Sequence, residues 1–393
     1  MRSPVTIIKP ESKFLFRSSD FFHFFMLFMM LASFVSPIFN NINIRHAIVF
    51  LGGSCFYFLA LKQIFSTRFE IGLFVRLILM LLIIFLGILA TAEEIRWELI
   101  YASLNFYCLF VFVSTNNIFT ISYRFYKWNG WIFVIIALIL IALSKSSVAY
   151  IFEDGRETGA LVLGMTNPNL TGLLISGVFS MLLINFNSMK YKPIIILIMG
   201  YLTYLILLTG ARNAFISTMC LLIYALFYKD KKIPSYILII MMVIPVLFIL
   251  VYLQLYWAGF EDFVFLGKDF FSGRQNTFIY FWESLKTPLH YLFGNIGSLS
   301  FANALNGPLA VFCNVGFVGF LLFYWNLGDK LLFLNNMAYS QKSRLAMVCI
   351  LGVCLQASAE SLMFLGVFPS SAFVYFYFLI ASSNEQNSKD SLK

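Results

Sequence analysis

Long apolar stretches separated by short polar turns run along almost the whole chain. Each stretch is close to the roughly 20 residues that a helix needs to cross the hydrocarbon core of a membrane. We expect about twelve such helices, the second and the last two being the shortest. They lie at 21–39, 46–61, 71–90, 98–115, 130–149, 168–186, 193–209, 213–228, 234–257, 306–327, 344–358 and 366–382. The pattern predicts an all-α, polytopic integral membrane protein in which residues 1–393 form a single transmembrane domain.

One polar interruption, at residues 258–305, is much longer than the others. A connection of this length is uncommon unless it is disordered or carries function. Its high phenylalanine content argues against disorder, because disordered segments are poor in aromatic residues. We therefore expect one large loop that forms the lid or wall of a site.

Composition and charge give this loop a side of the membrane. Hydrophobic residues make up 61% of the chain and charged residues 11%, so the surrounding solvent must be lipid. The net charge of +9 comes from basic residues scattered through short loops, and we expect no nucleic-acid partner. Most of the 27 Lys and Arg residues fall in the loops on the side of the N-terminus. By the positive-inside rule both termini are cytoplasmic and the loop is extracytoplasmic.

Charged residues gather at the outward ends of the predicted helices and are rare in their centres. Arg76 lies inside the span 71–90, and we expect it to snorkel to the cytoplasmic interface. An ion-coupled transporter usually keeps ionisable residues near the middle of the membrane. The distribution favours chemistry at the outer rim over transport.

Three outward segments carry candidate chemistry. Asn167-Pro168-Asn169 predicts a helix start, with Pro near the first position and Asn as the cap. It follows the acidic run 153–157, which by itself is typical of a solvated loop. Arg212 precedes a helix that we expect to begin near Asn213, so it is either an interface anchor or part of an anion site beside free N–H groups. Arg274 lies in the large loop, where an ordinary exposed residue is the alternative.

The order and spacing of these motifs resemble a known group of proteins, the O-antigen polymerase and O-antigen ligase superfamily of bacterial membrane glycosyltransferases. The resemblance covers roughly residues 150–325. It rests on Asn167-Pro168-Asn169, Thr209-Gly210-Ala211-Arg212, Ser272-Gly273-Arg274, Phe293-Gly294-Asn295-Ile296-Gly297, and Asn306 followed after nine residues by Gly316-Phe317-Val318-Gly319. The chain departs from the family at Leu305, where the family has a histidine on which the ligase branch relies. This departure favours the polymerase branch.

The resemblance implies an enzyme that polymerises polyprenyl-pyrophosphate-linked repeat units into a surface polysaccharide, such as O-antigen, capsule or exopolysaccharide. The reaction takes place at the outer face of the bacterial cytoplasmic membrane. A flippase and a chain-length regulator are the implied protein partners, besides membrane lipid. An oligosaccharide ligase of the same superfamily is one alternative, and a lipid-linked-oligosaccharide flippase or other transporter is another.

Site roles follow from the demands of this reaction. Arginine forks suit a pyrophosphate leaving group, because their planar donors bind phosphate oxygens in pairs and stay charged. The catalytic candidates are therefore Arg212 and Arg274, with a general base drawn from Glu157, His290 and Glu360. The expected substrate-binding residues are Arg156, Asn167, Asn169, Asn306 and Trp282, the last by stacking on sugar or by anchoring at the interface. The outer loops contain no Asp-x-Asp motif, so we expect neither a metal nor another cofactor.

Overall fold

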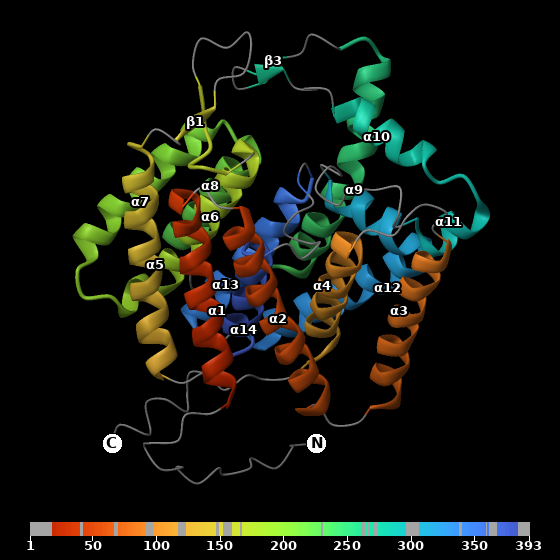
Figure 1. Cartoon of the computed structure of the whole chain (residues 1–393), viewed down its shortest axis with the longest axis horizontal. Helices are drawn as coiled ribbons and strands as arrows, with labels where there is room; N and C mark the ends of the chain where they lie inside the picture. Colours follow the sequence, from red (N-terminus) through yellow and green to blue (C-terminus); the bar gives the residue numbers. More distant parts are fainter. Residues whose placement is uncertain are drawn as a thin grey trace.

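Helices make up most of the chain (Figure 1). The structure, a computed structural model, describes residues 18–39, 42–66, 70–90, 97–116, 123–146, 149–151, 159–165, 167–228, 231–260, 264–265, 268–269, 274–295, 306–337, 340–358, 360 and 368–383. The first half contains α1 (Ser18–Val35), η1 (Ser36–Phe39), α2 (Ile42–Ser66), α3 (Ile71–Ala90), α4 (Trp97–Ser114), α5 (Tyr123–Leu143), β1 (Tyr150–Ile151), β2 (Ala160–Leu161), α6 (Pro168–Asn185) and η2 (Phe186–Ser188). The second half contains α7 (Lys192–Thr209), α8 (Arg212–Phe227), α9 (Ser235–Trp257), β3 (Val264–Phe265), β4 (Lys268–Asp269), α10 (Arg274–Glu283), α11 (Pro288–Phe293), α12 (Gly307–Met337), α13 (Gln341–Gln356) and α14 (Ser370–Ala381).

Every predicted apolar stretch falls on a helix. Among the described residues, six helices are long and apolar enough to cross a membrane: α2, α3, α6, α7, α9 and α12, while five further apolar helices are shorter. The helical membrane character is thus supported, and the number of twelve crossings stays a prediction. The boundaries of several helices were wrong: α2 extends beyond 46–61 at both ends, α5 begins at Tyr123 and ends at Leu143, and α12 runs on to Met337. Lys330, expected in a cytoplasmic loop, is consequently buried in α12, where its Nζ donates to the Thr115 carbonyl at the end of α4 at 2.5 Å.

Small residues line one face of the buried helix α6. Helix α6 is buried along nearly its whole length, and Gly172, Ser176 and Ser180 follow one of its faces at intervals of four. A Cβ on Gly172 would collide with Ala211 at the start of α8, so α6 and α8 approach closely there. Helices in lipid gain little from burying apolar side chains against each other, because the lipid tails are equally apolar. Small residues let the helices approach closely, and this close packing holds them together. By contrast α9 exposes most of its apolar surface, as expected of a helix that faces lipid.

The hydrogen bonds between helix ends define two opposite ends of the bundle. Asn187, just after α6, donates to the side chain of Gln341 at the start of α13 at 2.7 Å, so α13 runs antiparallel to α6. Ser343 of α13 donates to the carbonyl of Ser383, just after α14, at 3.4 Å at this same end. The opposite end therefore carries the start of α6 and the end of α13. We call it the site end.

The interruption at 258–305 is not a plain loop. It contains the β3–β4 hairpin, in which Val264 pairs with Asp269, followed by α10 and α11. A second hairpin, β1–β2, pairs Tyr150 with Leu161 ahead of α6. Strands of two residues are too short to give an alternating pattern, and neither hairpin was predicted. In Figure 1 β1, β3 and α10 all lie at the upper end of the bundle, which is the site end.

Arg76 does not simply snorkel. Its Nη1 donates to Oδ1 of Asn326 on α12 at 2.8 Å, and its Nε donates to the Gly72 carbonyl at 3.2 Å. The guanidinium therefore joins α3 to α12. This contact gives Arg76 a structural role within the bundle.

Candidate functional site

The side chains of an arginine and a glutamate from distant parts of the chain meet at the site end. Nη2 of Arg274, the first residue of α10, lies 3.7 Å from Oε1 of Glu360, which follows α13. The Glu360 side chain is only 6% exposed and that of Arg274 16%. Burial of an ion pair is costly unless each charge is well solvated by polar partners. The buried pair is therefore weak evidence for stability, and its two residues are candidates for a functional role.

The start of α6 supplies further polar groups to this pair. Asn167 caps the helix as predicted, its Oδ1 accepting from the backbone N–H of Asn169 at 2.8 Å, with Pro168 in the first position. The side chain of Asn169 lies near enough to Glu360 to lower the pKa of its carboxyl. One predicted substrate-binding residue, Asn169, and one predicted catalytic residue, Arg274, therefore both lie beside Glu360.

The start of α12 holds the turn that carries Glu360. Nδ2 of Asn306 donates to the carbonyl of Ser358 at 2.8 Å and to that of Pro245 at 3.2 Å, and its Oδ1 accepts from the N–H of Leu309 at 2.9 Å. Gly307 adds a backbone bond to the carbonyl of Ala357 at 2.7 Å. Asn306 is fully buried, so the structure supports a positioning role for it in place of the predicted substrate contact.

The surroundings of Glu360 change its acidity. Burial raises the pKa of its carboxyl to about 7, although Arg274 and Asn169 both act to lower it. A carboxyl with a pKa near the working pH can both take up and release a proton, which is the property of a general acid or base. Perturbed acids of this kind are concentrated at functional sites.

Arg212 lies close to the same helix start. It is the first residue of α8, one position earlier than the predicted start, and Ala211 before it offers no capping side chain. Gly172, which touches Ala211, lies one helical turn beyond Asn169 on α6. The first turn of α6 thus connects the Arg212 region with the Arg274–Glu360 pair. The uncapped N-terminus of α8 adds partial positive charge beside the Arg212 backbone.

The remaining predicted residues are not gathered here. Nε2 of His290, on α11, lies 3.4 Å from the carbonyl of Ala90 at the end of α3, and no contact joins it to Glu360 among the described residues. Trp282 lies on α10, but its side chain is outside the described part, as are Arg156, Glu157 and Leu305. Their predicted roles stay predictions.

The glycines of two motifs of the resemblance lie where two backbone segments pack closely against each other. Gly316 has φ +63° and ψ −171° and kinks α12, and a Cβ there would collide with the backbone of Leu292 and Phe293. Gly294 has φ +88°, and a Cβ there would collide with the backbone of Asn314. The N–H of Asn295 bonds the Cys313 carbonyl at 2.7 Å. The polar segment is therefore anchored to α12 by its backbone.

Gly316→Ala is expected to lower the free energy of unfolding by about 2–4 kcal/mol, because it adds a methyl group at a positive φ against a packed backbone. Gly200→Ala is the matched control: Gly200 lies within α7, and a Cβ there meets nothing within 4 Å. That change should be neutral or slightly stabilising, since Ala is the better helix former. Thermal unfolding of the purified protein in detergent measures both, and equal transitions would contradict the anchoring role.

The sequence alone identifies Glu360 only as one of three candidates for the general base. A signal was available, since Gln356, Ser358 and Glu360 interrupt an apolar C-terminal region at every second position. Gln356 and Ser358 lie within the predicted span 344–358, where polar residues are expensive and point to function, and Glu360 follows directly after it. In comparisons with known proteins, no family model, no curated protein and no solved structure matches the chain. The residues around Glu360 are therefore the only guide to function in the described part of the chain.

Proposed function

We propose that the chain is a glycosyltransferase that lengthens a surface polysaccharide from polyprenyl-pyrophosphate-linked repeat units. The observation that carries this proposal is the buried Glu360 carboxyl paired with Arg274 beside the start of α6. An acid that can exchange a proton, next to a fork that binds phosphate, meets the two demands of the reaction.

In the proposed reaction a hydroxyl oxygen of the acceptor sugar forms a bond to the anomeric carbon of the donor glycan. The bond from that carbon to the pyrophosphate oxygen breaks, and the electron pair leaves with the lipid pyrophosphate. The hydroxyl proton passes to Glu360. Arg274 and Arg212 stabilise the charge that develops on the leaving group, more strongly in the transition state than before it.

The shared position of Arg274 supports a coupling of the two events. In the free protein its guanidinium faces Glu360, whose pKa it lowers. As the leaving pyrophosphate attracts Arg274, the carboxylate loses part of its compensation and binds a proton more readily. Departure of the leaving group would thus favour proton uptake from the acceptor.

The transporter alternative has less support. The contact of Arg76 with Asn326 gives the cation inside α3 a partner within the bundle, while the acid with a raised pKa lies at the end of α13. The ligase alternative differs only in its acceptor. The ligase branch relies on a histidine, and this chain has Leu305 at that position.

Transfer by the purified protein in lipid vesicles tests the proposal. Vesicles containing a single lipid-linked repeat unit should yield a ladder of longer lipid-linked glycans on a gel. A product formed only with a different acceptor would identify a ligase. Movement of the substrate across the bilayer without any lengthening would identify a transporter and overturn the proposal.

We further propose that the site end faces away from the bacterial cytoplasm and that both termini face inward. The excess of Lys and Arg in the loops of the opposite end supports this orientation. Reporter fusions after Lys232 and at Lys393 should behave as cytoplasmic, and one near Lys286 as external. An externally active fusion at Lys393 would contradict the orientation.

A further inference from the structure

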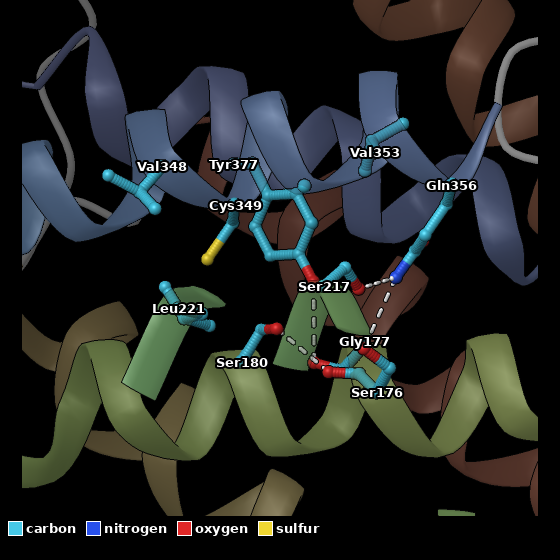
Figure 2. Close-up of a pocket in the computed structure, with 11 residues that line it drawn as sticks. Ser176, Gly177, Ser180, Ser217, Leu221, Val348, Cys349, Val353, Gln356 and Tyr377 are labelled. Carbon is cyan, nitrogen blue, oxygen red and sulfur yellow. Dashed lines mark hydrogen bonds between the residues drawn. The ribbon is translucent and has the colours of Figure 1, made fainter. Parts of the chain in front are cut away.

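A small polar cavity lies inside the bundle beneath the turn that carries Glu360. Figure 2 shows it between α6, α8, α13 and α14, with the side chains of Ser176, Ser217 and Gln356 on one side. Leu221 and Tyr377 line it as well. The space that the centre of a water molecule can occupy inside it is about 10 Å³. That is close to the space that one water needs.

The hydrogen-bond donors around the cavity are already used. The hydroxyls of Thr218 and Ser217 donate to the carbonyl of Ala214 at 2.7 and 3.2 Å. The hydroxyl of Ser176 lies 2.9 Å from that of Thr218, whose hydrogen is given away, so Ser176 is the donor. Nε2 of Gln356 donates to the hydroxyl oxygens of Ser176 and Ser217. These groups together tie α13 to α6 and α8.

One strong acceptor is left over. Oε1 of Gln356 has no hydrogen-bond partner, although the residue is only 4% exposed. Turning the amide over would move its N–H group to the unpartnered position, so one polar group is left over in either orientation. Buried polar atoms of native proteins are satisfied by protein or by ordered water. A water molecule can partner either group, and the cavity has room for one.

Gln356 is directly connected to the candidate base. Its backbone carbonyl accepts from the N–H of Glu360 at 3.1 Å, so it forms the other end of the same turn. Asn306 holds this turn from the α12 side. The hydroxyl groups of α6 and α8 hold it from the opposite side through Gln356.

We propose that the cavity holds one water molecule bound to Gln356 Oε1, and that Gln356 with this water is a positioning residue for Glu360. The water site stands on the geometry alone, whereas the positioning role rests on the proposed function. Arg274 of α10 is the charged group that faces Glu360, Asn169 of α6 faces it as a neutral group, and Cys349 and Tyr377 are the titratable groups that line the cavity.

Gln356→Met tests both parts, because methionine keeps a similar shape and removes the amide. A high-resolution density map of the wild-type protein should show one water within hydrogen-bond distance of Oε1, and the map of the variant should not. The variant's kcat for glycan transfer should fall about ten-fold, with the KM for the donor within two-fold. The pH midpoint of kcat/KM should move by at least about half a unit, because the contacts of Glu360 change.

Leu221→Met is the matched control, since it changes the wall of the cavity without touching a hydrogen bond. Its transfer rate and pH midpoint should match those of the wild-type protein. If Gln356→Met does not fold, Ser217→Ala removes one of the two hydroxyl acceptors and should move the midpoint in the same way by a smaller amount.

An unchanged pH midpoint in the folded variants would overturn the positioning role. A dry cavity in a map that shows other buried waters would overturn the water site. A wild-type protein that lengthens no glycan would sink the proposed function, while the map would still decide the water site.

Discussion

Glu360→Gln is expected to reduce glycan transfer by at least about 100-fold, while the protein still folds and still binds the lipid-linked donor. The amide keeps the size and polarity of the side chain, but it cannot accept the proton of the acceptor hydroxyl. Removing a general base typically costs a factor of about 10²–10⁴. Glu283→Gln, the same change at an exposed acid at the end of α10, is the control and should be neutral.

The pH dependence separates this effect from a loss of structure. The wild-type rate should rise as the pH rises through about 7, where the buried carboxyl ionises. The pKa of Glu360 in the folded protein lies above the ordinary value of 4.5, so the folded state binds this proton more tightly than the unfolded state. Stability therefore falls as the pH rises from about 4.5 to 7, and the ionised carboxyl costs about 3 kcal/mol above that window.

Glu360→Gln removes this cost, so the variant should unfold at a temperature no lower than the wild-type protein at pH 8. Thermal unfolding at pH 5 and pH 8, together with transfer rates across the same range, measures both effects. An active variant with the wild-type pH profile would exclude Glu360 as the base. Stability lost together with activity at pH 8 would show that the carboxylate has a structural role.

Local features of the fold were predictable because they depend on short-range chemistry. Asn167 and Pro168 satisfy the free N–H groups and the backbone angle of a helix start by themselves, whatever packs on α6. Length and apolar content likewise located the helices, since a helix in lipid satisfies its own backbone. The ends of α5 and α12 were missed because their extra turns contain polar residues that neighbouring helices cover.

Relations between distant residues were not predictable in the same way. Nothing in the sequence shows that Arg274 faces Glu360, because their contact depends on how α10, which packs on α9 and α12, is placed relative to the turn after α13. Asn306 was expected to bind a substrate because of its place in the motif of the resemblance, at the head of an apolar helix. The structure buries it against the turn of Ser358. The residues around the cavity were missed because isolated Ser, Thr and Gln barely change the apolar character of a span.

Arg212→Ala and Arg274→Ala are each expected to weaken binding of the pyrophosphate group about ten- to hundred-fold. Loss of a hydrogen bond to a charged group removes roughly 1.5–3 kcal/mol, and every 1.4 kcal/mol is a factor of ten. In cells either variant should accumulate single lipid-linked repeat units and make no long polymer. Arg→Lys at either position keeps the charge but not the fork, so its defect should be partial. Lys286→Ala removes an exposed cation from the same segment and is the control.

Arg274 contacts Glu360 as well, so its loss could act only through the base. The background variant Glu360→Gln separates the two roles. Inhibition of transfer, or of donor binding, by inorganic pyrophosphate measures the phosphate contact directly. If Arg274 binds the leaving group, Arg274→Ala should weaken this inhibition equally with Glu or Gln at position 360, because the arginine still contacts phosphate when the carboxylate is absent. If Arg274 only holds Glu360, the inhibition should be unchanged in the Gln background. Arg212 has its own helix start, so the effect of Arg212→Ala should be the same in both backgrounds. If well-expressed Arg212→Ala and Arg274→Ala proteins keep both the inhibition by pyrophosphate and the long polymer, binding of the pyrophosphate by these two arginines is excluded.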